Sequence, residues 1–145
     1  MLQWRVRVHG DVSGIRVGIV SAQFTAWGGS PLGNTSTRLR DNDGNAKSGF
    51  GFHGGGSTYS KLAGVSCLAV EFKDGDVLMF VLDRGARTLN AVNETSGESA
   101  LVCRNLPLGG TLYPAACAYS QGTAIELVEV RSCPRLQCSS NDWRR

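Results

Sequence analysis

The sequence has few of the residues and segments that an enzyme or a membrane protein usually needs. Histidine occurs only twice in 145 residues, as His9 and His53, and neither lies near a promising nucleophile or a second histidine in the chain. No apolar run approaches the ~18 residues of a membrane-spanning helix, and the first residues do not form a charged-then-apolar leader. We therefore expect no catalytic residues and no membrane association.

Strong charge and helical periodicity are also absent. The formal net charge is only +3 and the arginines are scattered, so we expect no nucleic-acid partner. No window repeats its apolar residues at helical spacing, whereas 19 glycines suit the reversals between many short strands. The sequence therefore predicts an all-β fold with little or no helix, in one domain.

Five cysteines are an odd number, which does not favour a framework of disulfides. Cys67, Cys103 and Cys117 lie in apolar, strand-like segments, where cysteine behaves as a small hydrophobic residue. Cys133 and Cys138 could close a small loop or share a metal, but a zinc site needs about four ligands and the chain offers no second suitable pair. We interpret them as free thiols, expect no bound metal, and predict an intracellular protein, cytoplasmic or nuclear.

The stretch 72–92 predicts a β-hairpin. The run Val77 to Leu82 is apolar at every position, so both faces of that strand must be buried, as in the centre of a sandwich. Turns around 74–76 and 83–86 flank it, and Thr88 to Val92 is suited to the second strand.

Further strands are indicated at both ends of the chain. Residues 4–8 alternate apolar and charged side chains, and Ile15 to Val20 follows after a turn, so these two segments are predicted to pair as a hairpin. In residues 125–130 the apolar phase shifts at Val128 and Val130, which indicates a bulge or the end of the strand. Residues 1–130 are expected to form the domain and 131–145 a polar tail.

Two glycine-containing segments are candidate binding sites. Residues 21–48 are expected to form a long polar loop, whose isolated Phe24 and Trp27 either contact a partner or attach the loop to the core. Residues 49–54 match G-x-G-x-x-G, but nothing after Gly54 is helical and the two phenylalanines suit a strand. We therefore expect no nucleotide and no other cofactor.

Several motifs, taken in order, resemble the SPRY domain, the core of the B30.2 module. The tryptophan-led strand 4–8 and Val17-Gly18-Ile19 are similar to two of its signatures, and the aromatic-glycine-aromatic strand to a third. The remaining elements are Gly75-Asp76-Val77 to Asp83, Thr88-Leu89 and Leu112-Tyr113-Pro114-Ala115. The resemblance implies a bent β-sandwich of two antiparallel sheets, of the concanavalin-like jelly-roll kind, with binding loops at one end.

The chain also departs from that family. The family usually has additional strands before the tryptophan-led one, so either the piece is truncated or another element covers that edge. If nothing replaces these strands, an unpaired sheet edge or exposed apolar face is expected to promote self-association. An Asn-Gly turn of the family is replaced by Asn93-Glu94, a less favourable pair for a two-residue hairpin.

The resemblance implies a non-catalytic module that recognises a protein or short peptide, as in substrate adaptors of ubiquitin ligases or in assembly subunits. Carried over residue by residue, Tyr59 corresponds to a peptide-contacting tyrosine, and Tyr119, Ser120 and Gln121 fall in a loop that lines the ligand surface. We hypothesise that Tyr59, Tyr119 and Trp27 rim a groove for an extended peptide, although each could instead pack on the sheets.

Two other functions stay open, while a small-molecule ligand is not expected. A lectin-like sandwich would use exposed aromatic residues beside oxygen ligands, which Asp41 to Asn45 could supply to calcium, although that segment lacks the closing glutamate of a calcium loop. A purely structural domain within a larger assembly is the second alternative.

Overall fold

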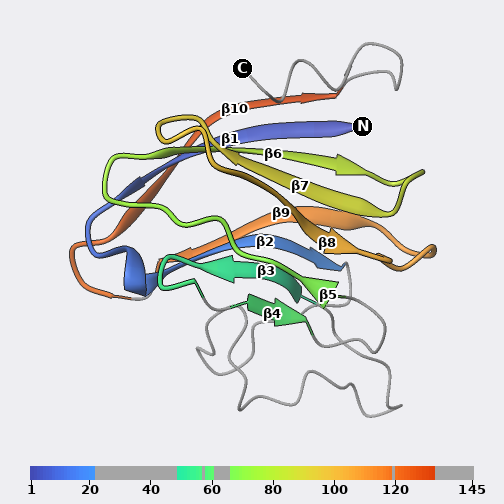
Figure 1. Cartoon of the computed structure of the whole chain (residues 1–145), viewed down its shortest axis with the longest axis horizontal. Helices are drawn as coiled ribbons and strands as arrows, with labels where there is room; N and C mark the ends of the chain where they lie inside the picture. Colours follow the sequence, from blue (N-terminus) through green and yellow to red (C-terminus); the bar gives the residue numbers. More distant parts are fainter. Residues whose placement is uncertain (22–48, 57, 61–65, 119, 133–145) are drawn as a thin grey trace.

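The computed structural model describes residues 1–21, 49–56, 58–60, 66–118 and 120–132, and it consists of two β-sheets (Figure 1). The six-stranded sheet has the order β10-β1-β6-β7-β8-β5 and the four-stranded sheet the order β4-β3-β2-β9. All pairings are antiparallel. The predicted all-β sandwich is therefore confirmed. The strands are β1 (Leu2–His9), β2 (Ile15–Ser21), β3 (Gly49–His53), β4 (Thr58–Ser60), β5 (Ser66–Cys67), β6 (Val77–Asp83), β7 (Thr88–Asn93), β8 (Ser99–Arg104), β9 (Leu112–Ala118) and β10 (Ala124–Ser132).

The predicted hairpin is formed by β6 and β7, and β6 lies between β1 and β7. Five consecutive residues of β6 are buried. Phe80 contributes to the core between the sheets, while Met79 and Val81 on the other face form a smaller cluster with Val92 and Met1. The interpretation of β6 as a central strand buried on both faces is confirmed.

The predicted pairing of residues 4–8 with 15–20 is wrong. β1 pairs with β6 and β10, whereas β2 pairs with β3 and β9 in the other sheet. The short 3-10 helix η1 (Val12–Gly14) carries the chain from one sheet to the other. Both strands have one apolar face, and these faces bury more surface by packing across the core than they would side by side in one sheet.

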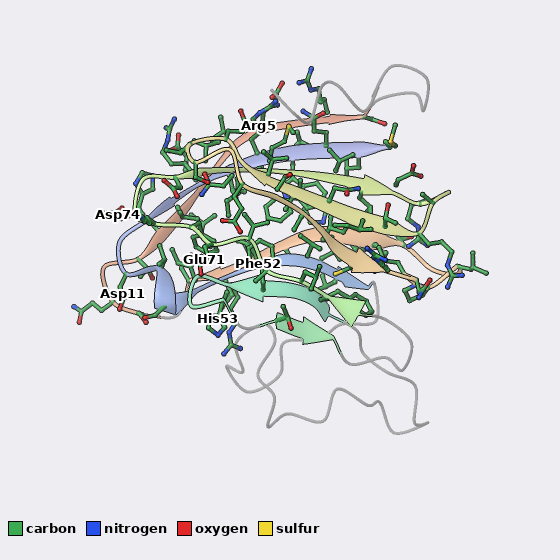
Figure 2. All side chains as sticks on the ribbon, in the orientation of Figure 1. Arg5, Asp11, Phe52, His53, Glu71 and Asp74 are labelled. Atoms are coloured by element: carbon green, nitrogen blue, oxygen red, sulfur yellow. The ribbon has the colours of Figure 1, made fainter. Side chains whose placement is uncertain are left out.

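Aromatic rings join the two sheets at the centre of the core. Trp4 stacks on Phe80 within the six-stranded sheet, with ring centroids 5.1 Å apart. Phe52 of β3 approaches Phe80 and Phe72, each at 6.0 Å. In Figure 2 Phe52 lies between the layers, while the next residue, His53, points away from them, as alternation along a strand requires. Such ring contacts stabilise a core by more than the burial of their apolar surface alone would.

The last strand contains the predicted irregularity. Arg5 pairs with Glu129 and Val6 with Leu127, so Val128 is left over as a bulge. The strand continues to Ser132, and the rest of the predicted tail, residues 133–145, lies outside the described residues. Within the described part of the chain, no helix has the length and apolar character needed to cross a membrane.

Candidate functional site: an apolar groove at the sandwich edge

An apolar groove runs between β9 and β10, which are outer strands of different sheets. The sheets separate here without another described strand to close the gap, and the resulting cavity has a volume of about 420 Å³. That volume is within the range of ligand-binding pockets. The groove, called the edge groove below, is lined by Trp4, Val6, Val17, Phe80, Pro114, Ala115, Ala116, Ala118, Ile125 and Leu127.

The register of β9 explains one wall of the edge groove. Pro114 and Ala116 lie opposite Ile19 and Val17 of β2, and cross-strand partners share one face of a sheet. Both β2 residues are buried, so the face of β9 that bears Pro114 and Ala116 is the core face. These two residues are nevertheless exposed. The side chains of this wall are small, and they leave open space where larger residues would fill the sandwich.

The opposite wall is formed by β10. Leu127 pairs with Val6 and Ile125 with Val8, and both partners on β1 are buried. Leu127 therefore projects from the core face of its sheet, yet 62% of it is exposed. A large aliphatic side chain that is exposed on a core face loses the stabilisation that burial would provide. The edge groove is thus an uncovered extension of the hydrophobic core.

Ion pairs on the outer face attach β10 to the rest of the sheet. Arg5 of β1 pairs with Glu129 of β10 and, at 2.5 Å, with Glu94 in the turn after β7. Glu126 accepts a hydrogen bond from Arg7 at 3.2 Å and lies 3.3 Å from His9. The hydrogen bond with His9, followed by the charge of Arg7, holds the pKa of Glu126 below its usual value. The ion pairs on the outer face therefore fix the position of β10, the strand that carries Leu127.

A compact turn, residues 120–123, precedes β10. Thr123 donates two hydrogen bonds to the carbonyl oxygen of Ser120, from its backbone nitrogen at 3.3 Å and from its hydroxyl at 2.6 Å. The turn packs tightly on the β1–β2 connection, since a methyl group added to Gly14 would lie 2.2 Å from the hydroxyl oxygen of Ser120. Gln121, at the tip, is exposed.

Neighbouring loops at this end of the sandwich are also held by hydrogen bonds. Asp11 accepts hydrogen bonds from the backbone and the hydroxyl of Ser13, at 3.0 and 2.7 Å, and these bonds lower the pKa of the Asp11 carboxyl. Gly10 donates its backbone N–H to Asp74 at 2.8 Å. Asp11 and Asp74 lie at the same end of the molecule in Figure 2. The described loops at this end of the sandwich therefore have conformations that are fixed by hydrogen bonds.

The residues predicted from the sequence occupy different parts of the molecule. Ser120 and Gln121 lie in the turn before β10 and do not line the edge groove, whereas Tyr59 is in β4, paired with Gly51 at the far edge of the four-stranded sheet from β9. Trp27 and Tyr119 lie outside the described residues, so the hypothesis of an aromatic groove stays a prediction.

Sequence reasoning missed the groove walls. Residues 112–115 appeared only as a family motif, and Ala115, Ala116 and Ala118 are the one signal that could have indicated a thin wall. The sequence of a single strand does not indicate whether the opposite sheet extends far enough to cover it, because this depends on the relative widths of the two sheets.

Side chains that could bind a metal do not cluster in the described part of the chain. Among the described residues, no group of three or more His, Cys, Asp or Glu side chains is placed to hold an ion. Residues 41–45, the calcium alternative, lie outside them.

No protein-family model matches the sequence, and no curated protein does. Among solved structures, the chain is similar to the SPRY domain of human HERC1, at 20% sequence identity and a TM-score of 0.48, over 86% of this chain and 72% of that one.

Proposed function

We propose that this chain is a non-catalytic protein-interaction module, and that the edge groove binds an extended apolar peptide segment of a partner protein. The observation that carries the proposal is Leu127, a large aliphatic side chain on a core face that remains 62% exposed. Exposed apolar surface of this kind, bordered by polar residues, is typical of interaction sites.

The form of the site favours an extended peptide. β9 and β10 are the outermost strands of their sheets among the described residues, so their outward backbone groups are available to a further strand. A peptide that adds to such an edge receives affinity from backbone hydrogen bonds and specificity from pockets for alternate side chains. Apolar side chains at every second position would enter between Leu127 and Ala116, while the backbone pairs with the edge.

The turn before β10 would supply polar contacts to the peptide. Ser120 and Gln121 would meet the end of the peptide, and Tyr119 lies between them and the groove wall in sequence. Tyr59 and Trp27 remain proposed contacts on a second surface. A role as a substrate adaptor or assembly subunit inside the cell, which the SPRY resemblance implies, belongs to the same proposal.

Two neighbouring residues of β10 provide a matched pair of variants. Leu127 lines the edge groove, whereas Val128 is the bulge residue and is 44% exposed outside it. Peptides selected from a random library on the intact chain would be titrated by calorimetry against the parent, Leu127→Arg and Val128→Arg. We expect Leu127→Arg to weaken binding at least about tenfold, or ~1.4 kcal/mol, and Val128→Arg to leave it nearly unchanged.

Three results would contradict the proposal. Equal binding by both variants would place the peptide elsewhere, and a library without binders would argue against peptide recognition. A dimer in light scattering that Leu127→Arg converts to a monomer would show that a second copy of the chain occupies the groove. Thermal melting of each variant confirms that any loss of binding occurs in a folded protein.

A further inference from the structure

Two cysteines far apart in sequence are in contact in the six-stranded sheet. Cys67 of β5 lies directly opposite Cys103 of β8, and their Sγ atoms are 2.7 Å apart. The residues are separated by 36 positions in the chain. No other pair of cysteines is recorded in contact in the part of the chain that the structure describes.

The backbone holds this pair at a spacing that a disulfide can bridge. Leu68 donates its N–H to the carbonyl oxygen of Val102 at 2.6 Å, so the adjacent pair, Cys67 and Cys103, occupies the closely spaced position of the antiparallel ladder. In that position Cα atoms are about 4.5 Å apart, at the lower end of the range of about 4.4–6.8 Å found for disulfides. Bond formation therefore requires side-chain rotation and little movement of the strands.

The two thiols differ in their access to solvent. Cys103 is fully buried, whereas Cys67 is half-buried in a two-residue strand at the edge of the sheet. The hydrogen bond with Cys67, followed by burial, raises the pKa of the Cys103 thiol. Cys67 is consequently the thiol that a small oxidant reaches first. Cys103 stays protonated until it reacts with the oxidised Cys67.

We propose that Cys67 and Cys103 form a reversible dithiol–disulfide site that responds to hydroperoxides. The Cys67 sulfur attacks the distal oxygen of the hydroperoxide, the O–O bond breaks, and an alcohol or water leaves while Cys67 becomes a sulfenic acid. The Cys103 sulfur then attacks Cys67, the S–S bond forms, and the S–O bond breaks. Water carries away the oxygen with the proton of Cys103, so two thiols and one hydroperoxide give one disulfide, one water and one alcohol. An external thiol reverses the reaction by exchange.

The disulfide attaches the edge strand β5 more firmly to the sheet. β5 consists of Ser66 and Cys67 only, and a strand this short contributes few hydrogen bonds. Oxidation ties it covalently to β8 and closes a chain loop that contains β6 and β7. A crosslink that spans a loop of this length stabilises the folded state by restricting the unfolded chain. This inference is independent of the proposed peptide site, which lies at the opposite edge of the six-stranded sheet.

The test treats the intact chain with hydrogen peroxide near stoichiometric concentration, followed by alkylation, digestion without reductant and mass spectrometry. We expect a linked peptide pair that joins Cys67 to Cys103 in the parent and in the control variant Cys117→Ser, and no such pair in Cys67→Ser. The melting temperature should rise on oxidation in the parent and the control, and fall back with reductant, while Cys67→Ser shows no change.

In Cys103→Ser, dimedone should trap the sulfenic acid on Cys67, because the second thiol is missing. If this buried substitution prevents folding, the comparison of Cys67→Ser with the control variant Cys117→Ser decides whether the disulfide forms. The proposal is overturned if both thiols stay free to alkylation while other cysteines oxidise. Linkage of Cys67 to Cys117, Cys133 or Cys138, or over-oxidation of Cys67 without a disulfide, would overturn it as well.

Discussion

Asn93 donates a hydrogen bond from its Nδ2 atom to a carboxylate oxygen of Asp76 at 2.7 Å, and both side chains are buried. The same Nδ2 donates to the carbonyl oxygen of Glu71, and the amide oxygen of Asn93 accepts from the backbones of Thr95 and Ser96. Asn93 therefore joins the β5–β6 connection to the turn after β7. The unfavourable Asn93-Glu94 pair is accommodated because a longer turn forms around the asparagine side chain.

Replacing Asn93 with Ala is expected to lower the free energy of unfolding by about 1–3 kcal/mol, because the buried Asp76 carboxylate loses a donor. Urea denaturation of the variant and the parent measures the loss. Glu98→Ala in the same turn is the control, since Glu98 is exposed and contributes only backbone hydrogen bonds among the recorded contacts. Equal effects of the two substitutions would contradict the role given to Asn93.

Gly18 is predicted to be intolerant of any side chain. A methyl group there would lie 2.0 Å from the carbonyl oxygen of Phe50 on the neighbouring strand, so the pairing of β2 with β3 would have to open. We expect Gly18→Ala to cost about 1–3 kcal/mol or more, as other overpacking substitutions do. Gly109→Ala is the matched control because nothing lies within 4 Å of its added methyl group. Comparable melting temperatures for both variants would show that the close approach is not required.

Met79 is expected to stabilise the outer face of β6 as a core residue would. It is 2% exposed and packs with Val81 and Val92, so truncation to Ala should cost about 2–5 kcal/mol. Val128→Ala, at an exposed position of β10, should change stability by no more than about 0.5 kcal/mol. Chemical denaturation distinguishes the two, and a small effect at Met79 would mean that β6 has one buried face rather than two.

His53 should make the fold less stable in mild acid. Burial, followed by the charge of Arg16, lowers the pKa of His53 below its ordinary value of 6.5, and Nδ1 accepts the N–H of Gly55 at 2.9 Å. Just below pH 6.5 the unfolded chain binds more protons at this site than the folded chain, so the free energy of unfolding falls as the pH decreases. Protonation also removes the acceptor for Gly55.

The measurement is the melting temperature of the parent and of His53→Gln between neutral and mildly acidic pH. The parent should lose more stability than the variant over this range, because glutamine does not titrate. If both lose the same amount, another group is responsible for the acid sensitivity.

Much of the fold could be predicted from local patterns. The continuous apolar run of β6 required burial on both faces, and the phase shift at Val128 indicated the bulge. The pairing of β1 with β2 was predicted wrongly, because two amphipathic strands joined by a short connection fit equally well in one sheet or across a sandwich. β5 comprises only Ser66–Cys67, while Val70 and Phe72 beyond it are buried without regular pairing.

The candidate site was less predictable than the fold. Ser120 and Gln121 were predicted from family resemblance and stay a prediction, since neither lines the edge groove, and the walls of that groove carried no local signal. The same holds for Cys67 and Cys103, which were predicted as separate small core residues.

The sequence by itself therefore determined where several of the strands lie and which face of the amphipathic ones is apolar, because alternation along a strand is a local property. Only the tertiary structure decided which strands meet and which apolar faces remain uncovered. Strand order and sheet width depend on contacts between residues distant in the chain. The open wall at Leu127 and the contact between Cys67 and Cys103 exist for that reason.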